Sequence, residues 1–318
     1  FDEPTASLSD KEVETLFGII HDLKEKGITI LYISHKMNEI FQMCDRATVL
    51  RDGKYIKTIE MAKTTRDEVI QAMVGRDISL FAKRTMPCQK KGTEPVLRVD
   101  GLCSDLFNQI SFDLYAGEIL GFFGLVGAGR TEVMRAIFGA DPYTKGSVIL
   151  NGKEIHCKSP HEAIERGIAL ISENRKEEGI LPNFDNKDNI SLASLKKYMS
   201  GIVINDNKKK QNALEKGKQV GLKPNDPAFM TVSLSGGNAQ KVILARWMST
   251  DATVMIFDEP TKGIDIGAKA DIYLLMEKMA EQGVAIIMVS SELTEVMGMS
   301  DRIIVMRDGE ITGELAKE

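Results

Sequence analysis

Residues 124–131 (GLVGAGRT) have the composition of a phosphate-binding loop. They follow an apolar stretch at 119–123 and open a stretch with helical spacing of apolar residues at 131–138. Glycines let the backbone wrap a polyphosphate, and the amides at the start of a helix form an anion-binding nest. The hydroxyl of Thr131 is a suitable ligand for Mg²⁺. Because Arg130 stands where the pattern has lysine, a glycine-rich turn without a ligand remains an alternative for this segment taken alone.

Two acids, Asp258 and Glu259, end a second apolar stretch that starts at Val254. Carboxylates at the carboxyl edge of a parallel sheet lie where α/β proteins bind their ligands. Asp258 can bind Mg²⁺ directly or through water, and Glu259 can polarise an attacking water. The same pair would also suit the start of a helix, so the acids alone leave both interpretations open.

Residues 234–240 (LSGGNAQ) form the most specific pattern in the chain. Ser235, Gly236 and Gly237 precede a predicted helix at 241–248 and lie upstream of the two acids. A serine and two glycines at a helix start provide a second anion-binding site, suited to a γ-phosphate.

In the chain the phosphate loop comes first, the LSGG segment second and the two acids third, and in that order the three patterns resemble those of an ATP-binding cassette (ABC) ATPase. Three further segments indicate a particular branch of this family: 173–176 (ENRK), 263–269 (GIDIGAK) and 289–293 (VSSEL). They are similar to the second cassette of the tandem ATPase subunits that power bacterial ribose-, galactose- and xylose-type sugar importers. The resemblance implies an α/β fold of the P-loop NTPase class, an ABC-type nucleotide-binding domain with a mainly parallel sheet and a helical subdomain at about 180–245. It also implies ATP and Mg²⁺ as cofactors.

The chain contains an internal repeat. Residues 1–5 (FDEPT) recur at 257–261, and at the same offset residues 33–54 align without a gap with 289–310. One register held over this length indicates two copies of one domain, a partial tandem repeat.

The repeat and the length, which suits roughly two domains, predict the domain organisation. We expect the remnant of a first ABC domain at 1–82, a linker at 83–94 and a second ABC domain at 95–318. The resemblance suggests a chain truncated at both ends relative to a longer tandem protein. Such cassettes bind ATP between the phosphate loop of one and the LSGG segment of the other. We therefore expect the chain alone to bind ATP weakly and to turn over little.

The resemblance also carries functional residues onto this chain. Asp2 and Glu3 match the metal-binding and catalytic acids of the first cassette, and His35 matches its γ-phosphate-sensing histidine. In the second copy, Ser291 occupies the position of that histidine, and Glu173 replaces a glutamine near the metal. The expected roles are catalytic for Glu259, Glu3 and His35; nucleotide-binding for Gly124, Gly127, Ala128, Gly129, Arg130, Thr131, Glu132, Ser235, Gly236 and Gly237; metal-binding for Thr131, Asp258, Glu173 and Asp2; and a degenerate switch for Ser291.

Arg130 departs from the usual phosphate loop in a way that affects chemistry. A planar guanidinium cannot take the place of a compact ammonium between the β- and γ-phosphates. We therefore expect the second site to bind ATP and to hydrolyse it slowly.

The predicted partners follow from the resemblance and from charge. They are sugar permease membrane subunits, a periplasmic or extracellular sugar-binding protein acting through the permease, and another ABC cassette. Residues 179–190 would belong to the surface that contacts the permease. Lys and Arg number 41 against 46 Asp and Glu, which argues against an extended nucleic-acid groove.

The expected location is the cytoplasmic side of the membrane, as a peripheral subunit. No apolar run approaches the ~20 residues that span a bilayer. Four scattered cysteines, Cys44, Cys88, Cys103 and Cys157, lack metal-binding spacing and are typical of a reducing compartment.

Two other functions are compatible with a cassette sequence. One is a soluble tandem ATPase acting on ribosomes or DNA. Such proteins usually carry a long charged linker and keep both sites intact, whereas this linker is short and the second copy is degenerate. The other is an interaction module that binds ATP without hydrolysing it.

Overall fold

The computed structural model describes residues 1–5, 8, 10–34, 36–51, 53–74, 84 and 94–316. The chain divides into two compact units. Unit 1 comprises Phe1–Ser79 with Asp265–Gly267, and unit 2 comprises Leu80–Ile264 with Ala268–Glu318. His35 and most of the predicted linker at 83–94 lie outside the described residues.

A six-stranded sheet forms the centre of unit 2. Its order is β14 (Glu310–Ala316), β13 (Arg302–Arg307), β5 (Ile119–Phe123), β12 (Ala285–Ser290), β11 (Val254–Asp258) and β8 (Ile168–Ile171). All neighbours are parallel except the β13–β14 hairpin. Strands β12, β11 and β8 are buried at every residue, as expected of parallel strands covered on both faces. The predicted mainly parallel sheet is confirmed.

A second, antiparallel sheet of four strands was not predicted. Its order is β4 (Ile110–Leu114), β3 (Leu97–Cys103), β6 (Lys145–Leu150) and β7 (Lys153–Ile155). Burial alternates along β4 and the first half of β3, so only one face of this sheet joins the core. That two-residue period was present in the sequence and could have revealed the sheet.

Helices follow the strands closely. They are α4 (Arg130–Ile137), α5 (Pro160–Glu165), α9 (Ile266–Glu281) and α10 (Leu293–Met299), with a short π-helix at Arg175–Gly179. The helices predicted at 131–138 and 268–280 are therefore confirmed to within two residues. Helix α8 (Gly236–Met248) begins earlier than the predicted 241, because Ser235 caps it and the glycines form its first turn.

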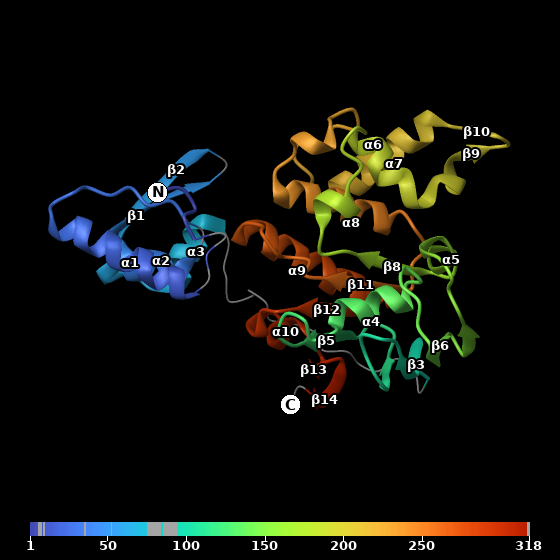
Figure 1. Cartoon of the computed structure of the whole chain (residues 1–318). Helices are drawn as coiled ribbons and strands as arrows, with labels where there is room; N and C mark the ends of the chain where they lie inside the picture. The colour runs from blue at the N-terminus through green and yellow to red at the C-terminus, as the bar shows by residue number, and fades with distance from the viewer. Residues whose placement is uncertain are drawn as a thin grey trace. The chain divides into compact units, whose positions relative to one another are not determined.

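A mostly helical region lies between β8 and β11 in the sequence. It contains α6 (Asn186–Ser191), a 3₁₀ segment (Leu192–Tyr198), a hairpin of β9 (Met199–Ser200) and β10 (Val203–Ile204), α7 (Asp206–Gln219), a 3₁₀ turn (Thr231–Ser233) and α8. Helices α6, α7 and α8 pack on one another, and α8 also packs on β8. Figure 1 shows these three helices gathered on one side of the central sheet.

Unit 1 repeats the last part of unit 2 in three dimensions. It comprises α1 (Asp10–Glu25), α2 (Met37–Met43), β1 (Arg46–Arg51), β2 (Lys54–Glu60), a 3₁₀ turn (Met61–Lys63) and α3 (Arg66–Val74). At the offset of the sequence repeat, α1, α2, β1 and β2 correspond to α9, α10, β13 and β14. Even the register shift between Val49 and Leu50 recurs between Val305 and Met306.

The strand predicted at 29–34 does not form. In the described part of this segment only Ile33 makes a bridge, with Asp2. Its counterpart β12 is held between β11 and β5, and no described segment of unit 1 takes the place of β5. A groove of about 1070 Å³ lies there instead, lined by 28–34 and 45–50. Residues 1–3 bond to one side of the segment, and no described strand lies on its other side, so it keeps an extended course without a longer ladder.

Candidate nucleotide-binding site

The loop at 124–129 connects β5 to α4 and has a backbone that favours glycine. Gly127 and Gly129 have φ of 85° and 88°, in the left-handed region. A Cβ on Gly124 would lie 2.5 Å from the Met306 carbonyl oxygen. Val126, at the tip, is 91% exposed. The loop is thus held tightly at its base and open at its tip, as a phosphate-binding loop requires.

We predict that Gly129→Ala disrupts this loop. Its Cβ would lie 3.1 Å from Gly309 Cα, and the left-handed backbone costs a residue with a Cβ roughly 1–2 kcal/mol. We expect ATP affinity to fall at least about tenfold, because the loop must rearrange, while the fold survives. Titration with a fluorescent ATP analogue measures the loss. Gly152→Ala is the matched control, because Gly152 also has a positive φ of 73° and has no atom near its Cβ position. Equal losses in both variants would contradict the prediction.

Arg130 and Thr131 point toward the acids at the end of β11. Arg130 Nη1 lies 3.5 Å from Glu259 Oε1, and the two side chains are only 8% and 9% exposed. Thr131 shares a side-chain hydrogen bond with Asp258. The start of α4 and the end of β11 therefore meet, which brings the predicted loop and the predicted acids together.

Burial changes the acid–base properties of both acids. It raises the pKa of Asp258 to about 7, against the opposing hydrogen bond from Thr131, with Glu173 and Glu259 adding to the rise. Burial also raises the pKa of Glu259, which is opposed by hydrogen bonds from Ser291 and by the charge of Arg130. Glu259 has a φ of 46°, a strained value for a residue with a Cβ. Raised pKa values and backbone strain are typical of functional sites.

Ser291, the predicted degenerate switch, joins this group. Both its side chain and its backbone donate hydrogen bonds to Glu259. Glu173 lies near enough to raise the pKa of both acids by its charge, and its carboxylate pairs with Lys262. The structure thus brings Ser291 and Glu173 next to the two acids.

The LSGG segment forms the exposed N-terminus of α8. Ser235 accepts a hydrogen bond from Asn238 Nδ2 at 3.0 Å. The carbonyl of Gly236 accepts one from Arg175 Nη1 at 3.0 Å. Arg175 also binds the Lys262 and Gly263 carbonyls at 2.9 and 3.1 Å. Sequence reasoning named the segment that contains Arg175 but missed the residue itself, which ties the LSGG segment to the loop after the acids.

The first-copy acids lie in unit 1. Glu3 has a φ of 44°, close to that of Glu259, and its amide donates to the Ile33 carbonyl at 2.9 Å. The Glu259 amide donates in the same way to Val289, the counterpart of Ile33. Asp2 and Glu3 thus repeat the backbone geometry of Asp258 and Glu259. The predicted histidine of this copy, His35, lies outside the described residues.

The residues at the end of β11 fit a magnesium ion. Mg²⁺ prefers hard oxygen ligands and keeps several waters, so one or two protein oxygens suffice. Thr131 and Asp258 supply such oxygens, and Asp258 Oδ1 is buried without a hydrogen-bond partner among the described residues. Within the same residues, no cluster of three or more His, Cys, Asp or Glu could hold a metal by itself. Thr131 and Asp258 therefore suit an ion whose other ligands would be water or phosphate oxygens.

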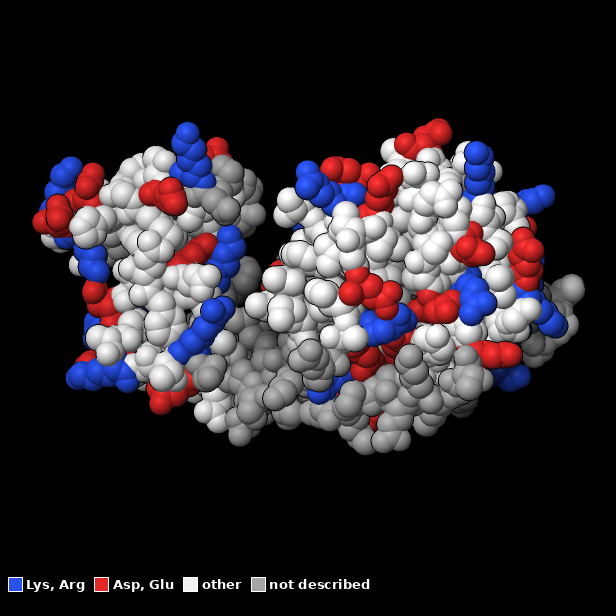
Figure 2. Space-filling model, turned by 90° about the horizontal axis from the view of Figure 1, so that it is seen from below, with Lys and Arg blue, Asp and Glu red and all other residues white. Residues whose placement is uncertain are grey.

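The described surface carries mixed charge. Figure 2 shows basic and acidic side chains interspersed over the face that it draws, without a continuous basic stripe on its described residues. Among the helices of the described ranges, none combines the length and apolar character needed to cross a membrane.

Comparison with known proteins indicates the class of protein to which this fold is similar. Residues 107–262 match the family described as ABC transporter. The fold is similar to the ATP-binding cassette MJ0796 in a dimeric post-hydrolysis state bound to ADP and Pi, with a TM-score of 0.61, 21% identity and coverage of 69% of this chain and 98% of that one. The ADP conformation of the cassette MJ1267 gives a TM-score of 0.62 at 20% identity, over 71% and 92% of the two chains. The chain therefore has the fold of an ATP-binding cassette, and its residues 107–262 are similar to the ABC transporter family.

Closer relatives are sugar-import proteins. The ribose import ATP-binding protein RbsA of Oceanobacillus iheyensis is 46% identical over 319 residues, covering 100% of this chain and 64% of the relative. A Rhizobium etli protein whose name refers to ribose, galactose and methyl galactoside import is 47% identical over 99% of this chain and 60% of its own length. The chain thus spans less than two thirds of the length of these relatives.

Proposed function

We propose that this chain is part of the ATP-binding and ATP-hydrolysing subunit of a ribose- or galactose-type sugar importer. The observation that carries the proposal is the meeting of the loop at 124–131 with Asp258 and Glu259 at one edge of a parallel sheet. Identity above 40% to ribose import ATP-binding proteins over the whole chain supports the sugar class. The two alternatives, a ribosome- or DNA-directed ATPase and a non-hydrolysing module, have weaker support.

Each group of site residues has a different role in the transfer of phosphate from ATP to water. The amides of Gly127 and Gly129 and those of the first turn of α4, including the Glu132 amide, would hold the phosphates, beside Ala128, whose amide bonds to the Leu125 carbonyl. Thr131 and Asp258 hold Mg²⁺, which neutralises phosphate charge when bound. Glu259 accepts the proton of the attacking water. Burial raises the pKa of Glu259, which favours uptake of that proton, and the charge of Arg130 opposes this uptake.

The pairing of Arg130 with Glu259 supports slow turnover at this site. A carboxylate that already faces a guanidinium at 3.5 Å is stabilised in its charged form and is a weaker base. Glu173 and Ser291 replace groups that would align the metal and the γ-phosphate. We infer that this site binds ATP and hydrolyses it slowly, and that Asp2, Glu3 and His35 serve the more active site.

Each ATP would be completed by another cassette, whose LSGG-type segment closes over the phosphate loop. Ser235, Gly236 and Gly237 are the corresponding groups on this chain, and Ser235 and Gly236 are exposed and ready for such contact. The remaining partners are the permease subunits and, through them, a sugar-binding protein. We place the subunit at the cytoplasmic side of the membrane.

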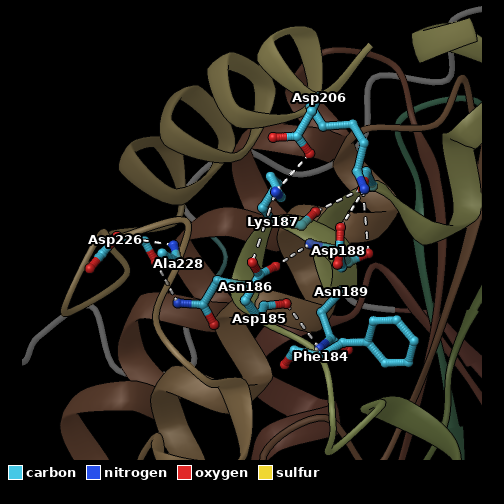
Figure 3. A network of polar contacts seen from close by, with 11 residues as sticks. Phe184, Asp185, Asn186, Lys187, Asp188, Asn189, Asp206, Asp226 and Ala228 are labelled. Atoms are coloured by element: carbon cyan, nitrogen blue, oxygen red, sulfur yellow. Dashed lines mark hydrogen bonds and ion pairs between the residues drawn. The ribbon is translucent and has the colours of Figure 1, made fainter. Parts of the chain in front are cut away.

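The segment predicted to contact the permease is held by a polar network (Figure 3). Asp185 caps α6 by accepting from the Asp188 amide at 2.8 Å. Lys187 pairs with Asp206 of α7 at 2.7 Å, and Asn186 donates to the Asp226 carbonyl at 3.0 Å. Because these bonds join α6 to α7 and to the loop after it, force applied to the segment 179–190 would move several elements together. This rigidity supports a coupling role.

ATP binding by the whole chain tests the proposal. We expect a fluorescent ATP analogue to bind in the presence of Mg²⁺, to be displaced by ATP and not by AMP, and to bind less tightly when Mg²⁺ is removed. Co-sedimentation with vesicles that contain a ribose-type permease, and not with empty vesicles, tests the transport assignment. Absence of nucleotide binding would overturn the ATPase proposal. Nucleotide binding without permease association would favour the ribosome- or DNA-directed ATPase, and nucleotide binding without turnover would favour the non-hydrolysing module.

A further inference from the structure

A buried carboxylate lies behind the site, on the first turn of α10. Glu295 is 4% exposed and accepts hydrogen bonds from Thr261 Oγ1 at 2.9 and 2.7 Å. Ser290 Oγ donates to the same carboxylate at 3.0 Å, and Lys269 Nζ does so at 2.8 Å. The hydroxyl of Tyr273 also donates to it. A single side chain thus receives three hydroxyls and one ammonium from three places: the loop after β11, the end of β12, and α9.

The two hydroxyl donors that flank the site belong to different loops. Thr261 lies two residues after Glu259, in the loop that follows β11. Ser290 ends β12 and is adjacent to Ser291, which donates to Glu259. Ser290 Oγ also accepts from the Glu292 amide at 3.0 Å, which fixes the turn that carries Ser291. Glu295 therefore joins the loop of the predicted base to the loop of the switch residue.

Unit 1 contains the same arrangement around Glu39, the repeat counterpart of Glu295. Thr5 Oγ1 donates to Glu39 at 2.5 Å, Ser34 Oγ at 2.9 Å and Tyr32 Oη at 2.8 Å. Lys36 Nζ lies 3.3 Å from the carboxylate. Thr5 and Ser34 are the counterparts of Thr261 and Ser290.

The other two donors come from different positions in the two copies. Val13 and Phe17 stand where unit 2 has Lys269 and Tyr273, and Met288 and Glu292 stand where unit 1 has Tyr32 and Lys36. Both copies nevertheless supply one phenol and one ammonium to the same carboxylate. The two copies thus supply the same kinds of donor from different sequence positions. This indicates that a charged carboxylate with all its hydrogen bonds satisfied is required at this position.

We propose that Glu295, and Glu39 in the first copy, are positioning residues that hold the loop of the catalytic glutamate in register with the loop of the switch residue. The proposal rests on the proposed ATPase function and names a further residue of the same site. Neither glutamate touches the phosphate loop in the contacts described above, so both act through their neighbours.

The physical reason is the cost of a buried charge. An unpaired carboxylate in the interior costs several kcal/mol, so Glu295 stays in place only while its donors do. Burial alone would raise the pKa of Glu295, but Lys269 and the hydroxyl donors outweigh it and hold the pKa below its usual value. Moving either loop away from Glu295 would leave that charge with fewer partners. The two loops consequently move together.

The test compares Glu295→Gln with Glu118→Gln in the full chain. Glu118 is also buried, at 2% exposed, and pairs with Arg302 at 2.6 Å, but it precedes β5 at the sheet edge opposite the phosphate loop. Both variants lose a buried ion pair, so both should lower the melting temperature. Only Glu295→Gln should raise amide hydrogen exchange in 259–263 and 290–293 together, by about tenfold or more. It should also abolish most of the gain in ATP affinity that Mg²⁺ gives.

Thr261→Val and Ser290→Ala each remove one donor and keep the carboxylate. Either change should raise exchange in both loops, since each loop holds the other through Glu295. Exchange that rises only in the loop of the substituted residue would overturn the proposal, as would a uniform rise across unit 2 in Glu295→Gln. The exchange measurement needs no nucleotide. If the chain failed to bind ATP while the two loops still responded together, the proposed function would fail and the positioning role would stand as a structural coupling.

Discussion

Asp258→Asn is expected to make the nucleotide-free protein more stable and to remove its response to Mg²⁺. Burial raises the pKa of Asp258 to about 7, well above its ordinary value of 3.8. The folded state therefore favours the protonated form. As the pH rises from about 4 to 7, the unfolded chain releases this proton and the folded chain keeps it, so wild-type stability is progressively lost relative to a neutral side chain. Above pH 7 the difference stays constant.

The expected size of this effect is large. Each unit of pKa shift corresponds to about 1.4 kcal/mol, so Asn should stabilise the fold by about 2–4 kcal/mol at pH 8. For a unit of this size the melting temperature should rise by about 5–10 °C. Near pH 4 the gain should disappear. With ATP present, the same variant should lose the increase in affinity due to Mg²⁺, on the order of tenfold, since the amide is a poorer ligand for the ion.

Melting curves of both proteins at pH 4.5, 6 and 8, with and without Mg²⁺ and ATP, measure this prediction. Asp251→Asn is the matched control, because its side chain is 87% exposed and pairs only at the surface with Lys197. It should change the melting temperature little at any pH. A variant of Asp258 that is no more stable at pH 8 than at pH 4.5, relative to wild type, would show that this carboxyl is not held protonated by burial.

Local patterns in the sequence predicted the parts of the site that are built from neighbouring residues. The loop at 124–131, the acids after Val254 and the serine–glycine helix start each depend on a few consecutive residues. The structure has the loop between β5 and α4, the acids at the end of β11, and Ser235 as the cap of α8, which begins earlier than predicted. The internal repeat also predicted the shared geometry of Glu3 and Glu259. These features follow from short-range rules on turns, helix starts and buried strands.

Features that depend on distant pairs were not predicted. Arg130 faces Glu259, and Arg175 bonds to carbonyl groups near the LSGG segment and after the acids. Each of these contacts joins residues far apart in the sequence, and no local pattern encodes them. The strand expected at 29–34 fails for the same reason, because a strand depends on its neighbours as well as on its own apolar residues. Glu39 and Glu295 could have been found, since both lie at the same position of the aligned repeat, each in a short helix that is otherwise partly apolar.

Substitution of Arg130 is expected to reveal an energetic competition between Glu259 and ATP. Arg130→Ala leaves Glu259 buried without its cation and should lower stability by about 1–3 kcal/mol at pH 8. Glu259→Gln should instead change ATP binding. The guanidinium no longer faces a carboxylate at 3.5 Å and becomes available to phosphate, and a negative charge near the γ-phosphate is removed. ATP affinity should then rise severalfold.

The double variant Arg130→Ala with Glu259→Gln separates the two effects. Because neither charge is left unpaired, stability should recover most of the loss, while ATP affinity should remain low because the cation is absent. Melting temperature and ATP titration on the four proteins give both coupling energies. Arg135→Ala is the control from the same helix, since Arg135 pairs with Asp141 in a site that is about one third exposed and should cost less than about 1 kcal/mol. If the single changes simply add in both measurements, Arg130 and Glu259 act independently, and the slow turnover proposed for this site must come from Ser291 and Glu173 instead.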